Sequence, residues 1–130
     1  MTIRVAIVDD QALMRDGSTM IVEAQPEIEV VGDAEKGWLG VELCRRLRPD
    51  VVLMDIRMPE MDGIEATQLI SSDDVCDTKI SVLTTFDLDE YVYSAMRAGA
   101  SGFLLKDTPA REFVAAVEVI VRGCQGSVAG

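Results

Sequence analysis

The chain has 130 residues, 48% of them hydrophobic, and a net charge of −11 at neutral pH. It is long enough for one domain with one core. The negative charge argues against direct binding to nucleic acid or to an anionic membrane, because both need a positive surface. The chain contains no histidine, which excludes a phosphohistidine or a histidine general base of its own. We find neither a membrane-length apolar stretch nor a signal-peptide layout, and expect a cytoplasmic protein.

The first strand-like run covers residues 3–8 and is closed by Asp9 and Asp10. A helix is predicted after it, because apolar residues at helical spacing continue as far as residue 26, a proline. Residues 28–31 form a second predicted strand, ended by the glycine at position 32. The residues at helical spacing in the first predicted helix are Leu13, Gly17, Met20, Ile21 and Ala24.

Leucines at every fourth position between 39 and 47 predict a second helix, and residues 51–54 a third strand. Asp62 and Glu65 have the spacing of a helix start signal, which predicts a third helix. The fourth strand is predicted at residues 80–83. Asp87 and Glu90 repeat the start signal for a fourth helix, and Gly99 is a plausible stop for it.

A short fifth strand is predicted at residues 103–105, followed by a last helix with Pro109 in its first turn. We assign residues 1–122 to one domain. The glycine-rich residues 123–130 are predicted to be the start of a linker or a tail. The apolar stripe of the last helix is predicted to be Phe113, Val114, Val117, Ile120 and Val121.

Strands that alternate with helices of this length predict a doubly wound α/β fold with a parallel sheet. The strands are almost continuously apolar, so both faces of the sheet should be covered by helices. Ligands of such folds bind at the carboxyl ends of the strands.

Polar side chains follow four of the predicted strands. The first strand is followed by Asp9 and Asp10, the third by Asp55, the fourth presents Thr84, and the fifth is followed by Lys106. Converging carboxylates repel one another unless a cation lies between them, and an all-oxygen set suits Mg²⁺. A carboxylate beside such a metal can accept a phosphoryl group, with an ammonium and a hydroxyl stabilising its oxygens.

Each of these residues also has an ordinary explanation. Asp10 can be a helix N-cap and Asp55 a turn acid. Lys106 can be a solvated surface lysine, and Thr84 an ordinary strand residue. The joint pattern at the strand ends favours phosphoryl transfer.

With these residues in view, the chain resembles the receiver domain of bacterial response regulators, in the NarL/FixJ (LuxR-type) subfamily. The resemblance runs from residue 3 to residue 123. It implies a flavodoxin-like fold, in which five parallel strands take the order 2-1-3-4-5. The motifs that carry it are VAIVDDQ at 5–11, DVVLMDIRMPEMDGIEA at 50–66, SVLTT at 81–85 and AGASGFLLKD at 98–107.

The resemblance implies a role for each matched residue. Asp55 would accept a phosphoryl group from the phosphohistidine of a cognate sensor histidine kinase. Asp10 would ligate Mg²⁺ directly and Asp9 mainly through water, with Asp55 and the backbone carbonyl of Arg57 as further ligands. Lys106 would pair with the phosphoryl group.

The resemblance also implies a switch and two tuning positions. Thr84 would move toward the phosphoryl group, and Phe103 would change rotamer to fill the vacated space. Arg57 and Phe86 would tune the lifetime of the phosphoryl group, and because both are large we predict slow self-dephosphorylation. Asp107 stands where the family often has proline.

Members of this subfamily usually carry a C-terminal helix-turn-helix domain, and none follows within these residues. We expect a domain cut from a longer transcription regulator, with a stand-alone receiver as the alternative. We also expect a homodimer on phosphorylation, and no enzymatic activity beyond the chain's own phosphorylation and dephosphorylation. A haloacid-dehalogenase-like phosphatase would need a second acid where Arg57 stands. A flavin-binding module would need a glycine-, serine- or threonine-rich loop in place of Asp9-Asp10-Gln11.

Overall fold

The computed structural model describes residues 2–73, 77–84, 89–106 and 108–122. Within them, strands and helices alternate along the whole chain, and the five strands form one parallel sheet in the order β2-β1-β3-β4-β5. The predicted fold class and strand order are confirmed. The elements are β1 (Ile3–Val8), α1 (Ala12–Glu23), β2 (Ile28–Ala34), α2 (Gly37–Leu47), β3 (Val51–Asp55), α3 (Gly63–Ser71), β4 (Lys79–Thr84), α4 (Asp89–Ala98), β5 (Gly102–Leu105) and α5 (Ala110–Arg122).

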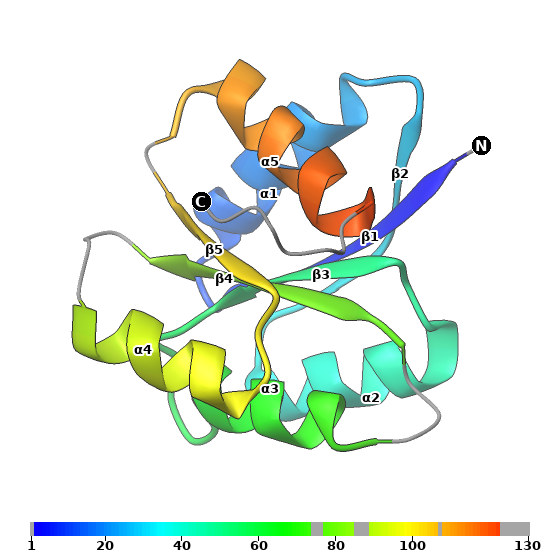
Figure 1. Cartoon of the computed structure of the whole chain (residues 1–130). Coiled ribbons are helices and arrows are strands. Elements are labelled where there is room, and N and C mark those ends of the chain that lie inside the picture. The colour runs from blue at the N-terminus through cyan, green and yellow to red at the C-terminus, as the bar shows by residue number, and fades with distance from the viewer. Residues whose placement is uncertain (1, 74–76, 85–88, 107, 123–130) are drawn as a thin grey trace.

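The sheet lies between two layers of helices, with α1 and α5 on one face and α2, α3 and α4 on the other (Figure 1). Alternate residues of each central strand therefore enter two different cores. On β3, Val51 and Leu53 face the α1 and α5 side, whereas Val52 and Met54 join the core beneath α2 and α3. This explains why the central strands are apolar at every position rather than at alternate ones.

Several predicted boundaries are confirmed by specific contacts. The Asp62 side chain accepts a hydrogen bond from the backbone N–H of Glu65 at 2.9 Å, which caps α3. Gly99 ends α4 with a φ of 118°, a conformation that favours glycine. The second strand, however, does not end at Gly32. It continues to Ala34, with a register irregularity where Val5 pairs with Val30 and the next residue of β1 pairs with Gly32.

The helix predicted at α1 is present, but the residues that stand at helical spacing there do not all face the core. Leu13 is 84% exposed and Met20 is 73% exposed, and Ala24 is exposed as well. The buried side of this helix is instead formed by Ser18 and Val22, with Ile21 packed against the core. α1 carries apolar residues on two sides, so helical periodicity alone did not select the side that faces the sheet.

The register of the sheet brings the polar strand ends to one edge. Val8 pairs with Met54, Asp55 pairs with Leu83, and Thr84 pairs with Leu105. The residues directly after these strands therefore emerge at the same end of the sheet. Four predictions concern residues outside those that the structure describes: the tuning position Phe86, the helix start signal at Asp87, the departure at Asp107, and the linker or tail at 123–130.

Among the described residues, no helix is both long enough and apolar enough to cross a membrane.

Candidate phosphoryl-acceptor site

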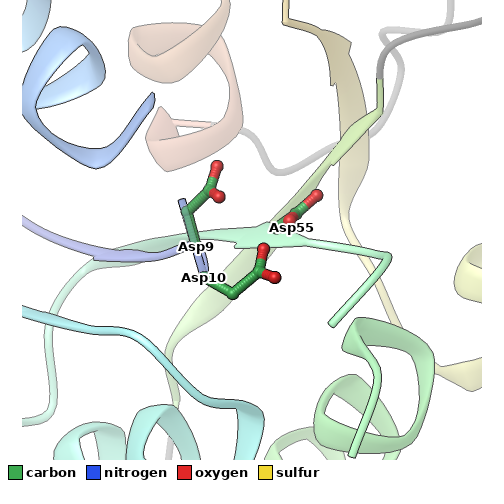
Figure 2. A group of neighbouring side chains, drawn as sticks. All are labelled: Asp9, Asp10 and Asp55. Atoms are coloured by element: carbon green, nitrogen blue, oxygen red, sulfur yellow. The ribbon is translucent and has the colours of Figure 1, made fainter. Parts of the chain in front are cut away.

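Three carboxyl groups gather where β1 and β3 end (Figure 2). Asp9 and Asp10 follow β1, and Asp55 is the last residue of β3. Each of the three offers a carboxylate oxygen, and these oxygens lie within 4.8 Å of one another. Asp9 is 1% exposed and Asp55 is 4% exposed, while Asp10 lies at the surface. Burial of two acids beside a third is costly unless cations balance them.

Asp9 is held in place through both its side chain and its backbone carbonyl. Its side chain accepts a hydrogen bond from the backbone N–H of Gln11 at 2.9 Å, which shapes the turn into α1. Its backbone carbonyl accepts a hydrogen bond from the Arg15 guanidinium at 2.8 Å. Arg15 in turn lies 3.8 Å from a carboxylate oxygen of Asp33, near the end of β2. These contacts fix the acid pair relative to the edge strand of the sheet.

Lys106 supplies the cation that the buried acids need. Its Nζ lies 3.0 Å from Oδ1 of Asp55 and 3.2 Å from Oδ2 of Asp9. Its backbone N–H donates to the carbonyl of Thr84 at 2.8 Å, which fixes the end of β5 beside the end of β4. One buried ammonium is thus shared by two buried carboxylates, and the ordinary reading of Lys106 as a solvated surface lysine is wrong.

The site still favours proton uptake by Asp55. Burial raises the pKa of Asp55, and the charge of Asp9 raises it further, so that it rises from 3.8 to about 6 despite the hydrogen bond from Lys106. For Lys106, burial lowers the pKa, but the hydrogen bond to Asp55 and the charges of both acids outweigh this and leave its pKa raised. Lys106 therefore stays charged, and Asp55 is mostly ionised only above about pH 6.

The residues fit a hard divalent cation. The donor set consists of carboxylate oxygens only, and one lysine leaves the three acids incompletely balanced. Mg²⁺ prefers oxygen ligands, binds through one or two carboxylates and keeps several waters, which suits an acidic group at an open edge. Asp9, Asp10 and Asp55 would hold it. The contribution of the Arg57 carbonyl stays a prediction.

A cavity of about 170 Å³ lies over Asp55 and is lined by most of the predicted site residues. Asp10, Thr84, Arg57 and Lys106 all line it. Thr84 is buried, whereas Phe103 on β5 is 42% exposed and does not line the cavity. The structure thus brings the acid cluster, the lysine and the threonine together and leaves Phe103 on the outside of the sheet edge.

Sequence reasoning did not single out Tyr91, which lines the same cavity from α4, or Gly63. A Cβ atom at Gly63 would collide with the backbone carbonyl of Asp55, so the first residue of α3 must be glycine for the helix to approach Asp55. The Asp-Gly pair at 62–63, directly before a helical stripe, was the available signal for Gly63. Nothing in the local pattern marks Tyr91, because its partner Arg57 lies 34 positions earlier.

Comparison with known proteins places this chain in a family. The model of the response regulator receiver domain matches residues 5–118. LiaR, a transcriptional regulatory protein of Bacillus subtilis, is 46% identical over 121 residues, which are 93% of this chain and 57% of LiaR. VraR, a response regulator protein of Staphylococcus aureus, is 40% identical over 95% of this chain and 58% of its own length. The chain spans about half the length of these curated relatives.

Solved structures agree. The signal receiver domain of NarL from Mycobacterium tuberculosis superposes with a TM-score of 0.90 at 36% identity, covering 95% of this chain and 98% of that one. A two-component response regulator of the LuxR family from Aurantimonas has a TM-score of 0.88 at 34% identity, over 95% of this chain and 87% of that one.

The chain therefore belongs to the response regulator receiver domain family. Within that family it is a receiver of the LuxR/NarL type found in two-component systems.

Proposed function

We propose that Asp55 accepts a phosphoryl group, with Mg²⁺ held by Asp9, Asp10 and Asp55. The observation that carries the proposal is the position of Lys106, whose Nζ lies within 3.2 Å of both buried acids. A structural ion pair needs one acid for one lysine. A cluster of three acids, two of which share one ammonium beside a cavity, suits a site that gains and loses a charged group.

In the proposed reaction an oxygen of Asp55 attacks phosphorus as the bond from phosphorus to the donor nitrogen breaks. The imidazole of the donor leaves with the electron pair, and Asp55 becomes an acyl phosphate. Lys106 stays charged and stabilises the oxygens of the transferred group. Mg²⁺, when bound, would neutralise further charge on those oxygens. Because the chain has no histidine, the donor is another protein or a small phosphorylated compound.

The resemblance and the membership of the LuxR/NarL type support a sensor histidine kinase in the cytoplasm as the donor. We extend the proposal to Thr84 and Phe103 as the switch, and to Arg57 and Phe86 as residues that slow hydrolysis. The chain would catalyse only its own phosphorylation and dephosphorylation, and would not act as a phosphatase on other molecules. Since the curated relatives are transcriptional regulators of about twice this length, the domain would control a DNA-binding output.

We also propose that phosphorylation promotes a homodimer. Leu13 and Met20 on α1 and Val119 on α5 are exposed apolar side chains on neighbouring helices, which could contribute to such an interface. Light scattering coupled to size exclusion, with and without phosphorylation, would measure the change. A mass that stays that of a monomer at high concentration in both states would contradict the dimer while leaving the acceptor role intact.

The acceptor role is tested by incubating the chain with Mg²⁺ and acetyl phosphate and locating the label by mass spectrometry. We expect one phosphoryl group on Asp55, and none in Asp55→Asn or when a chelator removes Mg²⁺. Asp16→Asn, an exposed acid on α1, is the matched control and should be labelled as the unaltered chain is. A label that persists in Asp55→Asn would overturn the assignment.

A further inference from the structure

Arg57 and Tyr91 both line the cavity over Asp55, here called the acceptor cavity, and form a cation–π pair with each other. The guanidinium carbon of Arg57 lies 5.3 Å from the centre of the Tyr91 ring. Arg57 lies two residues after Asp55, in the segment between β3 and α3, and Tyr91 lies in the first turn of α4. Tyr91 packs against the core beneath α2 and α3, whereas Arg57 is exposed. The ring is thus the fixed partner, and the arginine is the partner free to leave.

The pair contributes to the lining of two neighbouring hollows. The acceptor cavity of about 170 Å³ contains Asp55, Thr84 and Lys106, and a wider hollow of about 470 Å³ lies beside it, lined by residues that include Met58 and Pro59. Both hollows share Ile56, Arg57 and Tyr91 as lining residues. Since Ile56 is buried, the Arg57 and Tyr91 side chains form the accessible part of this shared lining, and we call these two side chains the partition.

We propose that Tyr91 is a positioning residue that holds Arg57 in this partition and thereby limits access of water and of small phosphodonors to Asp55. The inference rests on the proposed acceptor role of Asp55. In hydrolysis, the oxygen of a water forms a bond to phosphorus while the bond from phosphorus to Asp55 breaks. The carboxylate leaves with the electron pair, and the water's proton remains on phosphate or passes to solvent.

The partition should affect both hydrolysis of the phosphoryl group and phosphorylation of Asp55 by a small donor. In an in-line displacement the incoming water occupies the position that the leaving group of the donor occupied during phosphorylation. A side chain that narrows this position therefore slows hydrolysis and slows phosphorylation by a small donor together. When the cation–π contact is lost, the arrangement with Arg57 away from the ring becomes more populated, and both rates rise in proportion.

We expect Tyr91→Leu, which keeps an apolar group on the core but removes the ring, to speed both rates about two- to fivefold, the factor that corresponds to an exposed cation–π contact. Tyr91→Phe keeps the ring face and should behave as the unaltered chain does. The matched control is Tyr93→Leu. Tyr93 forms a similar pair with Arg97 on the same helix at 5.6 Å but lines neither hollow, so its loss should leave both rates unchanged.

The decisive measurement is the decay of phosphorylated protein in single and double variants. Because Tyr91 acts through Arg57, Arg57→Gln should match Tyr91→Leu, and Tyr91→Leu should add nothing in the Arg57→Gln background. Arg57→Gln changes an exposed side chain, so the test survives even if Tyr91→Leu is poorly folded. Equal decay in all single variants, or an undiminished effect of Tyr91→Leu in the Arg57→Gln background, would overturn the inference. Absence of label on Asp55 in the unaltered chain would instead overturn the acceptor role.

Discussion

Asp55 is an acid that the folded chain holds in a setting that favours its protonated form. The pKa of Asp55 is raised to about 6, first by burial and then by the charge of Asp9. The folded state therefore binds this proton more tightly than the unfolded chain, whose carboxyl keeps the ordinary pKa of 3.8. The stability that protonation contributes is complete below about pH 4 and is lost as the pH rises through about 6.

Asp55→Asn removes this ionisation, and we expect it to raise the free energy of unfolding of the metal-free protein at pH 7.5 by about 1–3 kcal/mol. The gain over the unaltered chain should shrink as the pH falls from 7.5 to 4. Urea unfolding in the presence of a chelator, repeated across this range, measures it. Asp16→Asn should change stability by less than about 0.5 kcal/mol at every pH. A loss of stability in Asp55→Asn at pH 7.5 would show that the pairing with Lys106 outweighs burial.

Most residues of the candidate site could be predicted from the sequence. Asp9, Asp10, Asp55, Thr84 and Lys106 are marked by their places after apolar strands, because a parallel sheet brings such positions to one edge. The contacts between the side chains of the site could not be predicted from the sequence. The Lys106 ammonium contacts two acids because the side chains at the ends of β5, β3 and β1 extend toward one another. The order of residues along the chain does not reveal these contacts.

Gly63 in α3 and Gly17 in α1 are both helical glycines, but only Gly63 lies close to other backbone atoms. Gly63→Ala would place a methyl group on the backbone carbonyl of Asp55, so either α3 or the end of β3 must shift. We expect a loss of about 2 kcal/mol or more in the free energy of unfolding and weaker phosphorylation of Asp55. Chemical unfolding and the labelling assay with acetyl phosphate measure the two effects.

Gly17→Ala is the control for that substitution. Gly17 lies inside α1, and a Cβ atom there would meet nothing within 4 Å. Alanine should therefore stabilise the protein by about 0.4–1 kcal/mol through its better helix propensity and smaller loss of backbone entropy. Phosphorylation should not change. If both variants lose stability equally, the close approach of α3 to Asp55 is not what requires glycine at position 63.

Helix α4 and strand β3 should differ in hydrogen exchange. Every residue of β3 is buried, and the strand lies between β1 and β4. Among residues 91–98 of α4, Ala95 is the only side chain that is fully covered. Amides of β3 should therefore exchange through global unfolding, and those of α4 through local opening at a much faster rate. Equal protection of the two elements, measured by mass spectrometry, would contradict this.

The elements also show where sequence reasoning reached its limit. Strand positions, the Asp62 cap and the Gly99 stop were predictable because each depends on local chemistry. The buried side of α1 was not, since Leu13 and Met20 satisfy helical periodicity as well as Val22 does. Which stripe faces the sheet is decided by the packing of α1 beside α5, which is a property of the assembled fold.

For the molecule as a whole, the net charge of −11 and the acidic site predict two separable responses to ions. Sodium chloride should raise the melting temperature modestly, because it screens repulsion over the whole surface. Magnesium chloride at equal ionic strength should raise the melting temperature further. At a magnesium concentration 100 times the dissociation constant of the site, binding should add about 2.7 kcal/mol to the free energy of unfolding. Asp10→Asn should weaken the additional magnesium effect and leave the sodium effect unchanged. Identical curves for the two salts would contradict a metal site.

Lys106 links strands that are not neighbours. It directly follows the edge strand β5, yet its ammonium reaches acids at the ends of β3 and β1. From Asp9 the contacts continue through Arg15 to Asp33 near the end of β2, the opposite edge strand. The carboxyl end of the sheet is thus tied from one edge to the other by a line of polar contacts, in which Arg15 joins the backbone carbonyl of Asp9 to Asp33. A change of charge at Asp55 alters the middle of that line, so both edges of the sheet should respond to it together.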